Sequence, residues 1–262
     1  MAAKVKISRK SLYRRVFRSL PPGFKLKNRI LIATHHKTGT NWMRSIFKDI
    51  AKDLSLRLLA YHVHPPAISP PYDIVHSSQA YFSRDMLEDS YRGIHMVRDP
   101  RDQIVSAVFY HQKSNEPWLQ IPRVEFGEKS YQETLNSFGS LEEQINFEME
   151  HNSNVHLLHM EEIADKMKDF KIIKYEDLIV DRGLERFRKI FEYLGFAPIV
   201  MNICLAAAKK NSLFSGNVRS SHVRSGAAGQ WKNYFSEENK MKFKEQFPYV
   251  LEKLDYEKDT SW

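Results

Sequence analysis

Two patterns of hydrophobic and polar positions alternate along the chain. Residues 29–34 (Arg-Ile-Leu-Ile-Ala-Thr) are a short apolar run of strand-forming residues, and residues 41–54 follow with apolar positions every three or four residues. The pair is repeated where the apolar run 93–98 precedes the helical spacing of residues 101–111. Short buried strands that alternate with amphipathic helices are typical of a mostly parallel sheet covered on both faces.

Further runs extend this predicted sheet. Residues 170–175 are predicted as a strand, and a helix over residues 184–194 follows with Gly195 as its C-terminal cap. Residues 72–76 have a weaker strand pattern. The sequence therefore predicts a single α/β domain over residues 24–262, with a mostly parallel sheet flanked by helices.

Residues 112–140 interrupt the alternation. They contain Pro117, Pro122, Gly127 and Gly139 and have no long periodic stretch. Connections of this length are usually functional or mobile. We therefore predict an extended insertion or lid at this point of the chain.

Charge distinguishes the N-terminal part from the rest. Residues 1–48 contain 13 Lys or Arg and no acidic residue, whereas the remainder has 27 bases against 32 acids. Apolar positions between Leu12 and Leu20 have helical spacing that the following Pro-Pro-Gly ends. We predict a basic helix or arm over residues 1–23. It is docked on the domain, bound to an anionic membrane surface or acidic partner, or part of a transit segment.

Composition excludes several classes of protein. Of the 262 residues, 42% are apolar, which rules out a disordered chain. The single cysteine rules out an internal disulfide framework and a four-cysteine zinc site. Neither a membrane-spanning run nor a signal-peptide pattern is found in the sequence, so a cytoplasmic protein is expected.

The loop between the first predicted strand and helix has the chemistry of an anion site. It consists of Lys37, Thr38, Gly39, Thr40, Asn41 and Trp42. Backbone N–H groups at a helix N-terminus bind anions, a glycine lets the backbone approach an oxygen closely, and a lysine adds positive charge. In a Walker A loop the glycine precedes the lysine, which is not the order here. The pattern favours a P-loop-like phosphate loop, with an ordinary strand-to-helix turn as the alternative.

Two later segments have residues suited to further anion sites. Arg98 ends a predicted strand and Ser106 lies in the next helix, and a guanidinium with a hydroxyl suits a phosphate. A surface Arg–Asp pair at a helix start is the alternative interpretation. Residues 223–233 are basic and punctuated by glycines, so they form either a loop that closes over an anion or a plain linker.

Together the three segments resemble the motifs of the cytosolic-type sulfotransferases. Residues 35–42 are similar to the family's Tyr-Pro-Lys-Ser-Gly-Thr-Thr-Trp. Residues 98–106 are similar to its Arg-Asn-Pro-Lys-Asp-x-x-Val-Ser, and residues 224–233 to its Arg-Lys-Gly-x-x-Gly-Asp-Trp-Lys-Asn. The motifs occur in the family order and span residues 30–235, most of the chain.

The resemblance implies transfer of a sulfuryl group from 3′-phosphoadenosine-5′-phosphosulfate (PAPS) to a hydroxyl or amine of a small molecule, with no metal ion. It implies that Lys37 neutralises the leaving oxygen of the phosphosulfate, and that Trp42 and Tyr175 contact the adenine. It assigns the 3′-phosphate to residues of the second and third motifs, which are Arg98, Ser106, Arg224, Ser225 and Gly226.

An acceptor hydroxyl must lose a proton, so the reaction needs a base. The family uses the histidine of a Lys-Thr-His motif at a strand end, and the matching segment here ends at His76, 22 residues before Arg98. His76 is the predicted general base and His64 its rival, because an imidazole titrates near neutral pH. A neutral structural histidine at a strand end is the alternative.

The chain also departs from the family pattern. Ile74 stands where the family has a lysine, and His35 and His36 replace Tyr-Pro. Ser236 and Glu237 replace the Thr-Val of the family's dimerisation stretch, so a homodimer by that route is not expected.

Two other functions compete with the sulfotransferase interpretation. A P-loop-like kinase or nucleotide hydrolase would need a Walker lysine and a metal-holding acid, and neither is evident. A basic module that binds nucleic acid or a membrane surface through residues 1–48 would show binding that falls steeply with salt. Nucleic-acid binding is not favoured, because the body beyond this stretch is mildly acidic.

Overall fold

The computed structural model describes residues 25–66, 72–88, 90–167, 169–212 and 226–262. The predicted N-terminal helix or arm lies outside the described residues. So do Arg224 and Ser225 of the third motif.

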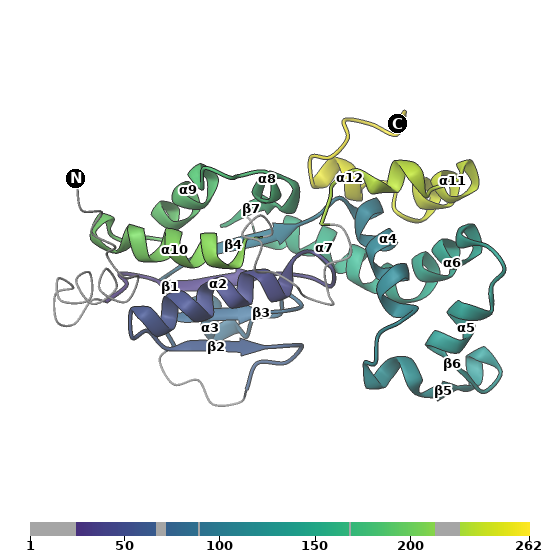
Figure 1. Ribbon diagram of the computed structural model, residues 1–262, viewed down its shortest axis with the longest axis horizontal. Helices are drawn as coiled ribbons and strands as arrows, with labels where there is room; N and C mark the ends of the chain where they lie inside the picture. Colours follow the sequence, from purple (N-terminus) through teal and green to yellow (C-terminus); the bar gives the residue numbers. More distant parts are fainter. Residues whose placement is uncertain (1–24, 67–71, 89, 168, 213–225) are drawn as a thin grey trace, which may run out of the picture.

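Five parallel strands form the central sheet, with β1 in the middle (Figure 1). The strand order is β2-β3-β1-β4-β7, and every neighbouring pair is parallel. The strands are β1 (Arg29–Ala33), β2 (Leu58–Tyr61), β3 (Ile74–Ser77), β4 (Tyr91–Val97) and β7 (Phe170–Lys174). Because β1 has a partner on each side, the loop that follows it emerges between the ends of two other strands. Such a position is where α/β sheets bind their ligands.

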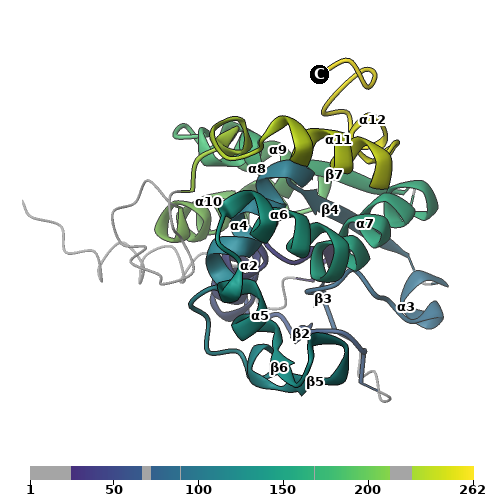
Figure 2. The same ribbon diagram turned by 90° about the vertical axis from the view of Figure 1, so that its right-hand side faces the viewer.

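Each face of the sheet is covered by helices, because successive side chains of a strand point to opposite faces. Figure 2 shows helices on both sides of the sheet. Ile30 and Ile32 of β1 pack under one set of helices, and Leu31 and Ala33 pack under another. The first set is α2 (Thr40–Asp53), α9 (Glu185–Tyr193) and α10 (Met201–Asn211). The second is α3 (Arg84–Glu88) and α7 (Asn154–Lys166).

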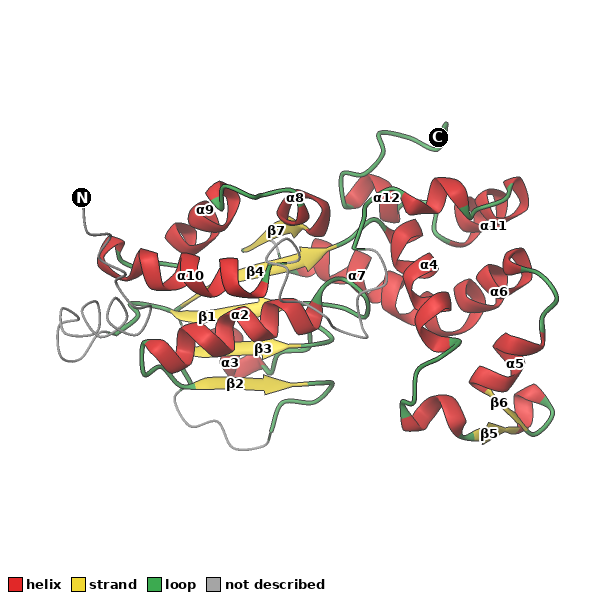
Figure 3. Ribbon diagram, viewed as in Figure 1, coloured by secondary structure: helices red, strands yellow, loops and turns green. Residues whose placement is uncertain are grey.

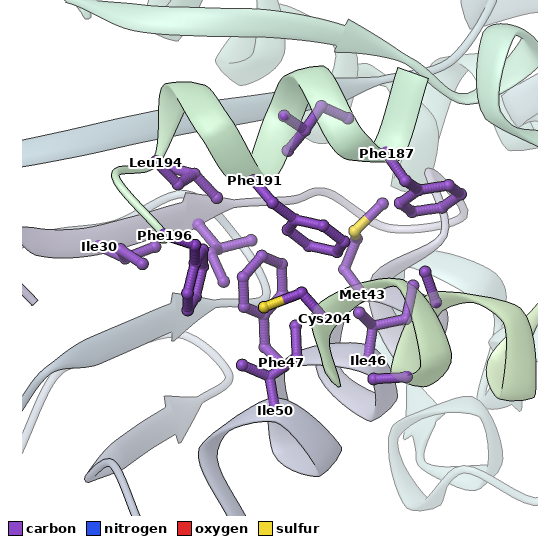
Figure 4. Packing of buried hydrophobic residues seen from close by; sticks show 14 of the residues in the cluster. Ile30, Met43, Ile46, Phe47, Ile50, Phe187, Phe191, Leu194, Phe196 and Cys204 are labelled. Carbon is purple, nitrogen blue, oxygen red and sulfur yellow. The ribbon is translucent and has the colours of Figure 1, made fainter. Parts of the chain in front are cut away.

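The layer under α2, α9 and α10 is the largest apolar cluster. Figure 4 shows Phe47 of α2 and Phe191 of α9 packed together beside Cys204 of α10. Cys204 is fully buried in this cluster, so the one cysteine of the chain is a core residue. The packing fixes α2, and with it the loop that leads into the helix.

A group of helices lies beyond the carboxyl ends of the strands (Figure 3). It contains α4 (Pro100–His111), α6 (Leu141–Glu148), α11 (Glu237–Gln246) and α12 (Val250–Lys253). A second apolar cluster joins it to β4 and α7 through side chains such as Val97, Val108 and Leu157. This group of helices therefore lies beside the carboxyl end of the sheet, where the predicted phosphate loop follows β1.

The segment 112–140 differs from the expected extended insertion. Its short elements pack on their own cluster, in which Leu119, Tyr131 and Leu135 are buried. Ser130 and Glu133 form a reciprocal capping box at the start of a helix. The elements are η1 (Pro117–Gln120), β5 (Pro122–Arg123), η2 (Val124–Phe126), β6 (Lys129–Ser130) and α5 (Tyr131–Ser137).

The short helical elements α8 (Tyr175–Ile179), η4 (Pro198–Val200) and η6 (Gln230–Asn233) complete the description, together with a π-helical turn, η3 (Met149–Ser153). Within the described part of the chain, no helix is both long and apolar enough to cross a membrane. The single α/β domain with a parallel sheet flanked by helices is confirmed.

Candidate functional site

The loop between β1 and α2 is held in shape by its own hydroxyl groups. Thr38 Oγ1 accepts a hydrogen bond from the backbone N–H of His35 at 2.9 Å. Thr40 Oγ1 donates to the carbonyl oxygen of His35 at 2.7 Å. Both side chains therefore bind His35, two residues beyond the end of β1, and the loop closes as a tight turn before the N-terminus of α2. The first N–H groups of a helix have no partner within it, so they are available to an anion.

Backbone conformation makes Gly39 necessary in this loop. Its φ is 99°, in the left-handed region that favours glycine. A Cβ at this position would lie 2.8 Å from Cε of Met96 and 3.3 Å from a ring carbon of Tyr175. Lys37 also has a positive φ, 62°, which is uncommon for a residue with a side chain.

Lys37 carries the positive charge of the loop into a partly enclosed place. Its Nζ lies 3.5 Å from the ring centroid of Tyr110. Burial, together with the nearby Arg98 guanidinium, lowers the pKa of Lys37 to about 7. A lysine with a lowered pKa in a cleft is characteristic of a functional site.

Arg98 lies at the carboxyl end of β4 and reaches the same loop. Its Nη1 donates to the carbonyl oxygen of Lys37 at 3.2 Å, and its guanidinium carbon lies 4.8 Å from the ring centroid of Tyr175. The arginine is 8% exposed, and its Nε is buried without a hydrogen-bond partner among the described residues. Asp99 caps α4 by accepting from the backbone of Arg101. A buried arginine with a free donor suits an anionic ligand.

The third motif meets the second through Asp102, which sequence reasoning did not single out. One carboxylate oxygen accepts from the N–H of Gly229 at 2.7 Å and the other from that of Trp231 at 2.8 Å. Gly226 accepts a hydrogen bond from the hydroxyl of Tyr175 at 3.3 Å. These bonds hold the described end of the C-terminal loop against α4 and α8.

Residues of all three motifs line one cleft of about 670 Å³. Of the predicted binding residues that the structure describes, all but Thr38 line this cleft. Thr38 is buried, and its hydroxyl bonds to the backbone of His35 within the loop. The predicted residues in the lining are Lys37, Gly39, Thr40, Asn41, Trp42, Arg98, Ser106, Tyr175 and Gly226. The lining also includes His36, Ser78, Glu116 and Asp102, which sequence reasoning did not assign to a site.

The family model of the sulfotransferase domain matches residues 27–255. The chain belongs to the sulfotransferase family. Human Sulfotransferase 2A1 is 24% identical over 238 residues, which covers 79% of this chain and 78% of that protein. The fold is similar to that of mouse sulfotransferase SULT7A1, solved in complex with PAP, with a TM-score of 0.54 at 17% identity. That match covers 93% of this chain and 89% of the mouse chain. The protein is thus a sulfotransferase enzyme.

In this sulfotransferase, His76 is not at the cleft, contrary to its expected place. Strand β3 continues past it, and His76 lies in register with Ile32 of β1 and Ala60 of β2. The side chain is fully buried, its Nε2 lies 3.3 Å from Oγ1 of Thr34, and burial lowers its pKa to about 3. The rival, His64, is exposed and does not line the cleft.

A different histidine of the sulfotransferase lines the cleft. His36, next to Lys37 in the phosphate loop, has its Nε2 3.1 Å from Nε2 of His111. Nδ1 of His111 in turn lies 2.8 Å from a carboxylate oxygen of Glu148. In the sequence, only His36 is conspicuous, as a departure from the family's Tyr-Pro. His111 and Glu148 lie in helices that are distant in sequence. Among the described residues, no group of three or more His, Cys, Asp or Glu is arranged to hold a metal ion.

Proposed function

We propose that this sulfotransferase moves a sulfuryl group from PAPS to a hydroxyl or amine of a small molecule. The observation that carries the proposal is the meeting of three motifs, distant in sequence, in one cleft that holds Lys37 and Arg98. The similar mouse enzyme was solved with PAP, the product that PAPS leaves behind.

The donor's two charged ends have matching groups in the cleft. The loop from Lys37 to Trp42 offers the N-terminus of α2 to the 5′-phosphosulfate. Arg98 and Ser106, joined by the third motif, offer a guanidinium and a hydroxyl to the 3′-phosphate. The unpartnered Nε of Arg98 supports this fit, because a buried donor requires an acceptor.

Two aromatic side chains are available for the adenine. The Trp42 and Tyr175 rings meet edge to face, with centroids 5.9 Å apart, and both line the cleft. Tyr175 also binds the carbonyl oxygen of Gly226, so a base placed against it would touch the C-terminal loop as well. Stacking on an aromatic ring recognises any base, and the two phosphates supply the remaining specificity.

The chemistry is displacement at sulfur in line with the leaving phosphate oxygen. The oxygen of the acceptor bonds to sulfur while the bond from sulfur to the bridging oxygen breaks, and negative charge collects on the phosphate. Positioned cations stabilise such charge, as they do in phosphoryl transfer. Lys37 is placed for this task, because an anion beside it would restore the protonated form that burial disfavours.

Selective stabilisation by PAP tests the donor assignment. A ligand at 100 times its dissociation constant adds about 2.7 kcal/mol, a melting shift on the order of 5–10 °C for a chain of this size. We expect this shift with PAP, none with ATP and Mg²⁺, and its loss in Arg98→Ala. The matched control is Arg92→Ala, on the same strand but bound to the carbonyl oxygen of Tyr193 outside the cleft. A shift with ATP and Mg²⁺ alone would contradict the proposal and favour nucleotide chemistry.

A further inference from the structure

Three side chains form a hydrogen-bonded line from the cleft into the protein interior. His36 faces the cleft, and its Nε2 lies 3.1 Å from Nε2 of His111. His111 Nδ1 lies 2.8 Å from Oε2 of Glu148. His111 and Glu148 are both fully buried. We call this arrangement the His36–His111–Glu148 relay.

Glu148 is built to remain a carboxylate in the interior. His111 and the hydroxyl of Tyr131 both bond to its Oε2 at 2.8 Å, and Asn152 and Ser153 donate to its Oε1, also at 2.8 Å. Burial acts to raise the pKa of Glu148. The interaction with His111 and the hydrogen bonds from Asn152 and Tyr131 outweigh burial and hold the pKa of Glu148 below its usual range.

The backbone around Glu148 is specialised for this role. Glu148 is the last residue of α6, and the next five residues, Met149–Ser153, form a π-helical turn. This turn carries Asn152 and Ser153, whose side chains return to the carboxylate. Short π-helical insertions are frequent at functional sites. The chain thus uses an uncommon backbone to complete the hydrogen bonds of one buried acid.

The hydrogen bonds determine the proton positions of a relay in which both imidazoles are neutral. An ionised carboxylate only accepts, so Nδ1 of His111 carries the hydrogen in their bond. Nε2 of neutral His111 then has a lone pair and accepts from Nε2–H of His36. Nδ1 of neutral His36 is therefore left with its lone pair.

Electrostatics keep His36 neutral when the site is empty. Burial is the main cause, and the charge of the adjacent Lys37 acts in the same direction, so the pKa of His36 lies well below 6.5. His156 stacks on the His36 ring with centroids 5.3 Å apart. A neutral imidazole at a cleft has the lone pair that a general base needs.

We propose that His36 is the general base of the reaction and that His111 and Glu148 are its positioning residues; this rests on the proposed function. As the acceptor oxygen bonds to sulfur and the bond to the bridging oxygen breaks, the acceptor proton moves to Nδ1 of His36. The Nε2 proton of His36 passes to Nε2 of His111. The relay ends with neutral His36 and a cationic His111 against the Glu148 carboxylate. This cation is stabilised by an ion pair, which an isolated histidine would lack.

The other candidate bases fit less well. Glu116 also lines the cleft, but its two oxygens accept from the Tyr110 hydroxyl at 2.8 Å and the Trp118 indole at 2.6 Å. Those hydrogen bonds outweigh the effect of burial and lower the pKa of Glu116, which makes it a weak base. His76 lies inside the sheet and does not reach the cleft.

The first experiment observes the protons directly. Nitrogen-15 NMR of histidine-labelled protein, free and with PAP, should show an unprotonated Nδ1 in His36 and a protonated Nδ1 in His111. His36→Gln and His111→Gln assign the signals. In Glu148→Gln the low-field His111 Nδ1–H signal should be lost or shifted, because its charged acceptor is gone. A protonated Nδ1 in His36 would overturn the relay without any turnover measurement.

The second experiment measures turnover of PAPS with water as the acceptor, read as PAP released, so that no acceptor need be known. His36→Gln should lower the rate by about 100-fold or more, the usual contribution of a general base. Glu148→Gln should lower it by about 10–100-fold, as loss of an orienting partner does. Imidazole added to His36→Ala should restore part of the rate. The matched control is His64→Gln, an exposed histidine that does not line the cleft, and its rate should stay within about threefold of the parent.

Measurement of PAP binding distinguishes a failure of the proposed function from a failure of the relay. Each relay variant should bind PAP within about threefold of the parent, since an outer residue that does not touch the donor contributes little to its affinity. A parent protein that does not bind PAP overturns the proposed function and leaves the base without its reaction. A His36→Gln variant that binds PAP and keeps its rate overturns the relay alone, as does loss of the rate in His76→Gln instead.

Discussion

The lowered pKa of Lys37 predicts that PAP binding weakens as pH rises. In the empty cleft, burial and Arg98 hold the pKa of Lys37 at about 7. A bound phosphate favours the ammonium and raises this pKa, so binding above pH 7 must take up a proton. Binding includes the free energy of protonating Lys37 only at a pH where Lys37 of the free protein is neutral. Affinity is therefore highest below pH 7 and falls as pH rises through it.

The size of the effect follows from that one value. With a free-state pKa of about 7 and a bound lysine that stays protonated, the dissociation constant should rise about 80-fold between pH 7.5 and 9.5. The 5′-phosphate is fully ionised over this range and adds no opposing change. Isothermal titration calorimetry in buffers of different ionisation enthalpy measures both the affinity and the proton taken up, which should approach one near pH 8.5.

Arginine at the same position is the matched control. Lys37→Arg keeps a cation that does not lose its proton in this range, so its affinity should change little between pH 7.5 and 9.5. Lys37→Ala should bind PAP more weakly and also without a pH slope. If the parent protein shows no loss of affinity and no proton uptake, Lys37 is protonated in the empty cleft and the electrostatic reasoning is refuted.

Two further substitutions test the walls of the cleft. Gly39→Ala places a Cβ 2.8 Å from Cε of Met96 at a φ of 99°. It should cost about 1–2 kcal/mol of unfolding free energy in urea, and PAP should restore less stability than in the parent. Asp102→Asn replaces the carboxylate by one carbonyl oxygen and one NH₂ group. The oxygen can replace only one of the two acceptors, so the NH₂ group faces the N–H of either Gly229 or Trp231. PAP affinity should fall about tenfold by calorimetry, because a charged hydrogen bond contributes about 1.5–3 kcal/mol; an unchanged affinity would show that the loop does not act on the donor.

The strand-to-helix units were predictable because their signals are local. Strand β1 and helix α2 have residue patterns that neighbours in sequence determine, and the structure confirms both within about a residue. Asp99 and Pro100 mark the start of α4, where the carboxylate caps the helix and proline occupies its first turn. The observed bounds of β4 and β7 also agree with the apolar runs that predict them.

Other elements have no such local signal. Strand β2 has only four residues, mostly half-exposed at the sheet edge, and was not predicted. Helix α6 was not predicted either, although Ser140 and Glu143 at its N-terminus have the spacing of a capping box. Residues 117–137 contain short elements whose order depends on their shared cluster rather than on periodicity.

The general base shows a different limit of sequence reasoning. Matching His76 to a family motif places it correctly at a strand, but the motif does not report how far that strand continues. One more residue, Ser77, still pairs with β1, so His76 is enclosed between two neighbouring strands. The alternative partners are far apart in sequence: His36 and His111 are separated by 75 positions, and His111 and Glu148 by 37. They meet because α4 lies against the phosphate loop and α6 packs against α4.

Adjacency of His36 and Lys37 links the two halves of the proposed reaction. Under the proposal, one residue removes a proton from the acceptor and the next neutralises the leaving oxygen, on opposite sides of the transferred sulfur. Peptide geometry fixes the distance between their backbones, and both residues line the cleft. The carbonyl oxygen of His35, bound by Thr38 and Thr40, anchors the pair to the end of β1. A longer loop would displace base and cation together, so its length is as much a part of the site as its side chains.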